Sequence, residues 1–167
     1  MKRLLFVLLM LSVLILPGCY TYNYTVSTIT KDGFIVDKNS YPIKASEIDR
    51  TWDRLLYCLS NHGYNVDSLD IHKIRPILIF TRYKIEVTGY PEAQVGYFDA
   101  QFDIKRLSFD NYIWIWFSPD QSGNAKDWKV VLRHEMLHMA LFQLTYNADR
   151  WHTREIWKEC SYVPSSP

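Results

Sequence analysis

The sequence predicts an α+β domain, in which a small, twisted and mainly antiparallel sheet packs on two helices. Apolar residues recur at helical spacing in residues 46–60 and again in residues 127–145. Runs of β-prone residues lie at 25–29, 34–36, 77–87, 94–104 and 111–117. A length of 167 residues with 48% hydrophobic residues is ordinary for a single core. One helix therefore precedes the three longer strands, and a second helix follows them.

The first part of the predicted domain is a hairpin followed by a helix. An Asp-Gly pair at residues 32–33 separates the first two β-prone runs and is typical of a hairpin turn. Ser46 is expected to cap the helix, with Asp49 as a weak capping box. Gly63 is expected to end it. The apolar residues that recur at helical spacing, and should face the core, are Ile48, Trp52, Leu55, Leu56 and Leu59.

The middle of the chain predicts three strands. Pro76 precedes the first, residues 77–87, whose second half alternates polar and apolar residues as in a half-buried strand. In residues 94–104, alternate positions are apolar and share one face. Residues 111–117 are apolar on both faces, which favours a central strand. Residues 118–124 predict a loop, and Asp127 is the expected N-cap of the last helix.

Residues 1–18 have the pattern of an export signal, with two basic residues followed by a short apolar run. The segment Leu16-Pro17-Gly18-Cys19 resembles the lipobox of bacterial lipoproteins. That resemblance implies cleavage before Cys19, acylation of Cys19 by fatty acids such as palmitate, and a lipid-anchored protein in the cell envelope. Tyr20 stands where inner-membrane lipoproteins carry Asp, so an outer membrane, facing the periplasm, is expected in a Gram-negative host. The alternative is a plain signal peptide.

The predicted mature chain has a tether at residues 19–24 and one domain at residues 25–167. Its formal net charge, +1 for the whole sequence, is too balanced to suggest a nucleic-acid partner. With Cys19 acylated, Cys58 and Cys160 are the two remaining cysteines. Outside the cytoplasm they are expected to form a disulfide, and the alternative is two separate buried thiols.

The segment His134-Glu135-Met136-Leu137-His138 carries the functional prediction. Positions four apart lie on one face of a helix, so both imidazoles can reach a single metal ion. Zn²⁺ accepts histidine nitrogens and prefers four ligands. Glu135 points about 100° away around the helix, where its carboxylate can act on a water rather than on the metal. The alternative is a pair of satisfied core histidines.

This motif and its apolar surroundings, residues 131–140, resemble the active-site helix of the zincin metallopeptidases. The resemblance implies a minimal zincin-like domain and one bound zinc ion. It also implies amide hydrolysis, in which Glu135 activates a zinc-bound water. The chain lacks the Gly and third His of the metzincin pattern, because Leu141 and Leu144 stand there. Residues 131–160 also resemble small bacterial lipoproteins with a short zincin-like domain.

His152 is the expected third zinc ligand. It lies fourteen residues after His138, beyond the end of the helix, at a distance that allows the chain to fold back. Glu155 and Asp149 are the alternatives, because other zincins use Glu or Asp at this position. Asp149 is also a candidate to accept the second N–H of a ligand histidine.

The expected substrate is a peptide or protein, including peptides of peptidoglycan because the predicted location is the envelope. The alternative function is a non-catalytic envelope lipoprotein with a structural or vestigial zinc site. Tyr146 and Arg150 are weak candidates to stabilise an oxyanion. His62 and His72 lie far from the motif in the sequence and are expected to be structural.

Overall fold

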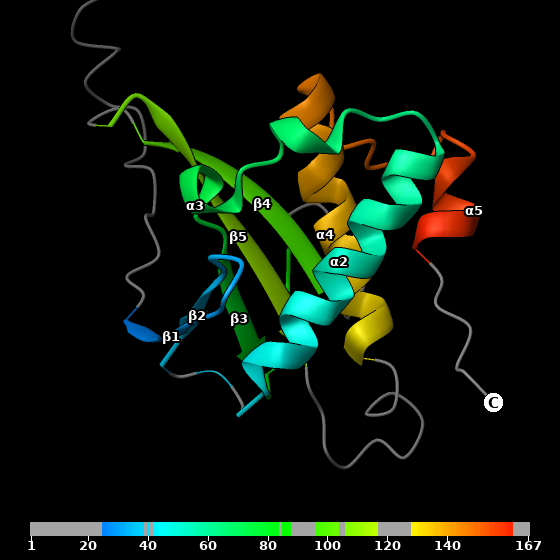
Figure 1. The fold of residues 1–167 in the computed structure, drawn as a ribbon. Helices are drawn as coiled ribbons and strands as arrows, with labels where there is room; N and C mark the ends of the chain where they lie inside the picture. Colours follow the sequence, from blue (N-terminus) through cyan, green and yellow to red (C-terminus); the bar gives the residue numbers. More distant parts are fainter. Residues whose placement is uncertain are drawn as a thin grey trace, which may run out of the picture.

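The protein is described by a computed structural model that covers residues 25–38, 40, 42–83, 85–87, 96–103, 106–116 and 128–161. Figure 1 shows a sheet with helices packed against it. The strands are β1 (Val26–Ile29), β2 (Ile35–Asp37), β3 (Ile77–Thr81), β4 (Gly96–Asp103) and β5 (Ser108–Trp116). The helices are α2 (Ala45–Asn61), α3 (Ile71–Ile74), α4 (Trp128–Thr145) and α5 (Ile156–Cys160), with the 3₁₀ turn η1 (Val66–Ser68). The predicted export signal, Cys19, the predicted tether, the predicted loop at 118–124 and Asp127 lie outside the described residues.

The α+β class is confirmed, and the sheet is mixed. Its five strands follow the order β1-β2-β3-β5-β4. The outer pairs, β1 with β2 and β4 with β5, are antiparallel, whereas β3 is parallel to both β2 and β5. The prediction of a mainly antiparallel sheet therefore holds only for the outer pairs. The physical reason is that α2 connects β2 to β3, and a helical crossover joins parallel neighbours.

The predicted hairpin at Lys31, Asp32 and Gly33 is confirmed, with Gly33 at a φ of 105°. Helix α2 begins at Ala45, and its N-cap residue, Lys44, makes no side-chain capping bond, so the prediction of a Ser46 cap was wrong. The Asp49 carboxylate instead accepts hydrogen bonds from the backbone N–H groups of Lys31 and Asp32. These bonds tie α2 to the hairpin turn.

Two strand boundaries differ from the prediction by three residues or more. Strand β3 ends at Thr81, six residues earlier than expected. Thr81 is paired with Trp116, the last residue of β5, so the chain after Thr81 has no further β5 residue to pair with. Strand β5 begins at Ser108, three residues earlier than expected, because it pairs with β4 along its length. The prediction that β5 is an inner strand is confirmed.

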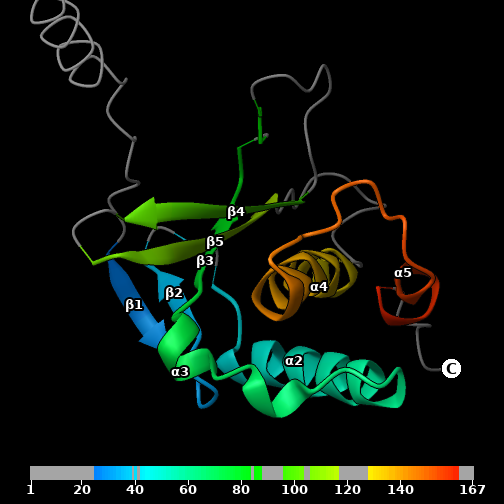
Figure 2. The ribbon, with the colours of Figure 1, turned by 90° about the horizontal axis from the view of Figure 1, so that it is seen from above.

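Helix α4 forms the centre of the core. It lies between the sheet, α2 and α5, as Figure 2 shows from above. Buried residues occur on all sides of its central part, as expected for a helix enclosed by other elements. Within the described part of the chain, no helix combines the length and apolarity that a membrane crossing requires.

The predicted disulfide between Cys58 and Cys160 is confirmed. It joins α2 to α5 across 102 positions of the sequence, with 5.7 Å between the two Cα atoms. Helix α5 has only five residues, so it has little stability of its own. The disulfide therefore fixes α5 beside the core helices.

Candidate metal centre

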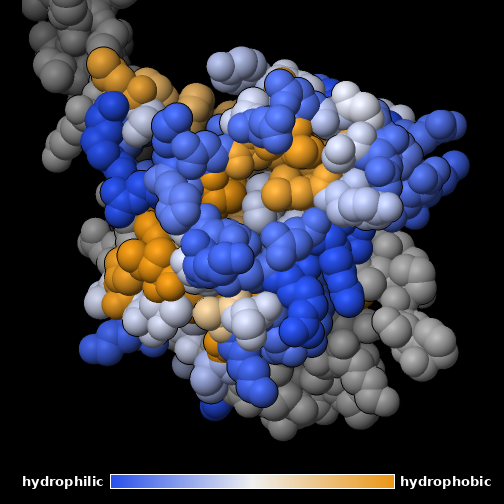
Figure 3. Space-filling model, viewed as in Figure 1, coloured by the Kyte–Doolittle hydropathy of each residue, from blue (hydrophilic) through white to orange (hydrophobic). Residues whose placement is uncertain are grey.

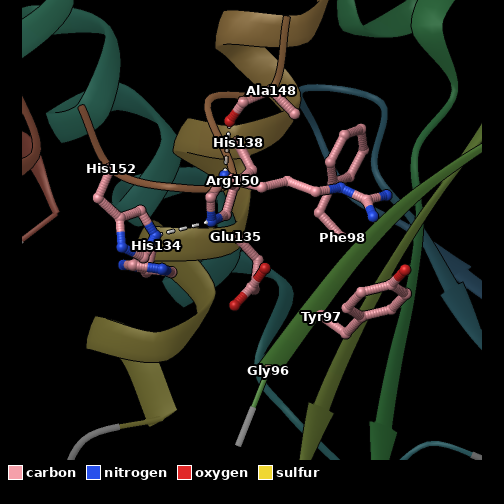
Figure 4. A pocket seen from close by; sticks show the side chains of 9 residues that line it. All are labelled: Gly96, Tyr97, Phe98, His134, Glu135, His138, Ala148, Arg150 and His152. Carbon is pink, nitrogen blue, oxygen red and sulfur yellow. Dashed lines mark hydrogen bonds between the residues drawn. The ribbon is translucent and has the colours of Figure 1, made fainter. Parts of the chain in front are cut away.

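Three imidazoles meet beside α4. His134 and His138 extend from one face of α4, and His152 comes from the loop before α5 (Figure 4). The Nε2 atoms of His138 and His152 are 3.2 Å apart. One nitrogen from each of the three rings lies within 4.8 Å of the other two. The structure therefore brings together the three histidines that the sequence predicts as zinc ligands.

The geometry and chemistry of these side chains fit a zinc ion. With Zn–N distances of 2.0–2.1 Å, two nitrogens of a tetrahedral site are about 3.3 Å apart, close to the separation between His138 and His152. The Nδ1 atom of His138 is 2.7 Å from the carbonyl oxygen of Ala148. An Nδ1–H donor to this carbonyl leaves the Nε2 lone pair free to bind a metal.

Two of the imidazoles are held in the neutral form that binds metals. Burial, together with the neighbouring imidazoles of His138 and His152, lowers the pKa of His134 to about 4. Burial also lowers the pKa of His138 to about 4, with a further contribution from His152, against the opposing effect of the Ala148 carbonyl. Near neutral pH, neither ring needs to lose a proton before it binds a cation.

Asp149 organises the loop that carries His152. Its carboxylate accepts hydrogen bonds from the backbone N–H and the hydroxyl of Thr153, the backbone N–H of Arg154 and the indole N–H of Trp157. Burial alone would raise the pKa of Asp149, but these bonds outweigh it and lower the pKa to about 2. Asp149 and His152 both have positive φ, at 49° and 53°, a conformation that costs energy outside glycine.

The structure thus separates the three residues considered for the third ligand position. His152 reaches the cluster. Asp149 holds the loop instead, and the N–H of His138 is directed to the Ala148 carbonyl rather than to Asp149. Glu155 is exposed at the N-cap position of α5 and does not belong to the histidine cluster.

Trp157 contacts the site and was not identified from the sequence. Its ring centroid lies 5.0 Å from that of His134, 4.4 Å from that of His138 and 4.5 Å from that of His152. It also links the rings to Asp149 through its indole N–H. The only sequence signal for this contact is that Trp157 lies five residues after His152. At that distance, one turn of helix can return the indole ring to the loop.

Glu135 lies in the same pocket as the three imidazoles, with only 6% of its surface exposed. Burial raises its pKa to about 8, against the opposing effect of a backbone hydrogen bond from Phe98. Strand β4 approaches this side chain closely at Gly96, where an added Cβ would lie 2.6 Å from Oε1 of Glu135. Glycine therefore makes room for the carboxylate.

The pocket has a volume of about 110 Å³ and opens between α4, the β4 backbone and the loop. Its lining residues are Gly96, Tyr97, Phe98, His134, Glu135, His138, Ala148, Arg150 and His152. Arg150 reaches across the pocket toward β4 (Figure 4), with its guanidinium carbon 5.7 Å from the ring centroid of Tyr97. Of the two oxyanion candidates, Arg150 lines the pocket, whereas Tyr146 is 84% exposed and does not.

The two remaining histidines lie elsewhere. His72 packs against Gly33 in the hairpin turn. Nε2 of His62 is 2.9 Å from a carboxylate oxygen of Glu159. His62 also lies beside Cys58 and Cys160, but these two sulfurs are bonded to each other and are not thiolate ligands.

Comparisons with models of known protein families, with curated proteins and with solved structures found no match to this chain.

Proposed function

We propose that this protein is a zinc-dependent amide hydrolase of the peptidase class. The observation that carries the proposal is the meeting of three imidazoles and one buried carboxylate in a single pocket. His134, His138 and His152 are the proposed metal ligands. Among the described residues, no fourth side chain joins this cluster. Three protein ligands are typical of catalytic zinc sites, which keep one position for water or substrate.

Glu135 is the proposed general base. When bound, zinc lowers the pKa of a water molecule toward about 7 and polarises a carbonyl oxygen. Glu135 then takes the proton of the attacking water and passes it to the leaving amine. Its burial supports this role, because a carboxyl group whose pKa lies near the working pH both accepts and donates a proton readily.

A peptide substrate is supported by the position of β4. This strand is at the edge of the sheet, and its residues 96–98 line the pocket. An extended peptide can add to a sheet along such an edge strand. Arg150 adds a positive charge on the same side of the pocket, which suits the negative charge that develops on a substrate oxygen.

The proposed location is the cell envelope, with the protein anchored by a lipid on Cys19. This part of the proposal rests on the export signal and the lipobox-like segment alone. It makes envelope peptides, including those of peptidoglycan, the nearest substrates.

The test compares purified residues 20–167 with the Glu135→Gln variant, for bound zinc and for cleavage of casein or a peptide library. We expect the variant to keep its zinc and to cleave at least about a hundredfold more slowly, because it has lost its general base. The control is Glu155→Gln, which changes an exposed glutamate outside the pocket and should retain activity. A metal-free wild type, or equal cleavage by all three proteins, would contradict the proposal.

A second experiment separates a general protease from an envelope hydrolase. Purified sacculi are incubated with the wild type or with Glu135→Gln, and the released muropeptides are separated by chromatography. Release by the wild type alone supports peptidoglycan peptides as substrates. Cleavage of casein without any release from sacculi restricts the proposal to protein substrates.

The alternative, a structural zinc site, is favoured by one observation. The ring of Trp157 lies within 5.0 Å of all three imidazoles, measured between centroids, and so encloses part of the site. Cobalt substitution distinguishes the two functions. Added azide should change the visible spectrum of a cobalt site with an open coordination position, and should leave that of a closed site unchanged.

A further inference from the structure

A buried arginine lies next to the metal centre in the sequence but faces a different part of the molecule. Arg133 immediately precedes His134 on α4, and only 6% of its surface is exposed. Its Nε atom is buried and has no hydrogen-bond partner. Among the residues that the structure describes, no carboxylate lies within ion-pair distance of it. Among these residues, the Arg133 guanidinium therefore has no anionic partner, and its buried Nε–H is left without an acceptor.

Arg133 lines a groove that is separate from the metal-site pocket. The groove has a volume of about 420 Å³ and is lined by Arg133 of α4 and by Asp53, Arg54, Tyr57, Cys58 and Asn61 of α2. Figure 3 shows mainly hydrophilic side chains over the exposed face of α2. Arg54 lines the same groove as Arg133, so two positively charged side chains share it.

This arrangement is unfavourable unless an anion joins it. A buried charge is costly without a partner, and a second charge of the same sign adds to the cost. Proteins normally place a carboxylate beside a buried arginine, but here the adjoining space is an open groove. A ligand with negatively charged oxygens would neutralise both guanidinium groups and satisfy the free Nε–H.

We propose that the groove between α2 and α4 binds a small oxyanion, either a phosphate or a carboxylate, through Arg133 and Arg54. The planar guanidinium group donates two parallel hydrogen bonds to either kind of oxyanion. The side chains of Asn61 and Tyr57 add polar groups along the same wall.

One lining residue opposes this binding. Asp53 carries a carboxylate, but it is exposed to water, which screens its charge. Arg133 is buried, so its attraction for an anion is screened less. Arg54 is exposed as well, so its charge and that of Asp53 largely offset each other, and the charge of Arg133 leaves the groove positive.

The experiment titrates the full, metal-free protein with inorganic phosphate or with succinate, at an ionic strength held constant with sodium chloride. Removing metal prevents either anion from binding at the histidine cluster, so the result does not depend on the proposed hydrolase function. Affinity is measured by calorimetry, and the ¹⁵N–¹H signal of Arg133 Nε, identified by its loss in Arg133→Met, reports contact. We expect saturable binding and a shift of this signal.

Three variants locate the site. Arg133→Met should weaken binding at least about tenfold, since it removes a charge-assisted bidentate contact. Arg54→Met should weaken it less, because Arg54 is exposed. The matched control is Arg50→Met, an exposed arginine of α2 that does not line the groove, and its affinity should equal that of the wild type.

The preferred anion identifies the ligand class, since tighter binding of phosphate points to a phosphorylated ligand and tighter binding of succinate to a carboxylate. The absence of saturable binding by the wild type would overturn the proposal, and so would equal affinity in the wild type and Arg133→Met. If Arg133→Met does not fold, an unchanged affinity in Arg54→Met overturns the two-arginine site, and a weaker affinity supports it.

Discussion

The two halves of the candidate metal centre are built in different ways. His134 and His138 are placed by the regular geometry of α4, a helix enclosed by apolar packing. His152 is placed by a short loop, whose shape depends on the hydrogen bonds of Asp149 and on the disulfide that holds α5. Substitutions that change apolar packing should therefore affect mainly the helix half. Substitutions that remove polar groups or the disulfide should affect mainly the loop half.

The largest expected loss of stability comes from the covalent link of the loop half. Replacing both Cys58 and Cys160 by Ala opens a loop closed across 102 positions, so the free energy of unfolding should fall by about 4–5 kcal/mol in the chain-entropy model. Urea denaturation of the variant and of the oxidised wild type measures the change. A loss below about 1 kcal/mol would show that α5 stays in place without the disulfide.

A cavity in the helix half should affect stability but not the ligands. Leu137 is fully buried on α4, so Leu137→Ala should lower the free energy of unfolding by about 3 kcal/mol. Zinc affinity, measured by competition with a chelating dye, should stay within about threefold of the wild type, because the spacing of His134 and His138 is unchanged. A large loss of affinity would mean that packing, and not helical spacing, positions the two imidazoles.

A change in the loop half should lower both the stability of the protein and its affinity for zinc. Asp149→Asn retains the shape of the side chain but places an amide N–H₂ group where the carboxylate accepts hydrogen bonds from its neighbours. The free energy of unfolding should fall by about 2 kcal/mol, and zinc affinity should fall by about tenfold to a hundredfold, as for other residues that orient a ligand. The same two measurements apply as for Leu137→Ala, which serves as the control. Unchanged zinc affinity would show that His152 does not need this loop conformation.

The two halves should also fail in different pH ranges in the metal-free protein. The pKa values of His134 and His138 are lowered to about 4, below the ordinary value of 6.5, so their contribution to stability should be lost as the pH falls from about 6.5 toward 4. The pKa of Asp149 is lowered to about 2, below its ordinary value of 3.8, so its contribution should be lost between about pH 4 and 2.

Urea denaturation at a series of pH values measures both ranges. Asp149→Asn should reduce the dependence between pH 4 and 2 and retain most of the dependence between pH 6.5 and 4. A variant that still loses the same stability between pH 4 and 2 would assign that range to other carboxyl groups.

The sequence predicted the helix half of the site better than the loop half, for a physical reason. Helical spacing is local, so the segment from His134 to His138 was sufficient to place two imidazoles on one face. His152 was also predicted as the third histidine of the cluster. However, the role of Asp149 depends on a loop with positive φ values, and that of Trp157 depends on how α5 folds back. Neither follows from spacing.

The errors in the predicted fold have the same origin. Local spacing predicts a capping box of Asp49 with Ser46, but the Asp49 carboxylate binds the turn at Lys31 and Asp32, which is distant in the sequence. The strand expected at residues 77–87 ends at Thr81, where its partner strand β5 ends. Local patterns identified the elements, but contacts between distant segments determined where they begin, end and pair.

The close approach at Gly96 couples the sheet to the chemistry of α4. An ordinary side chain there would overlap both Val131 and the carboxylate of Glu135. The backbone of the edge strand therefore forms one wall of the space in which the proposed base can rotate. An outward shift of this edge would widen the range of positions open to the carboxylate. The position of β4 and the freedom of the proposed base are thus connected through the absence of a side chain at Gly96.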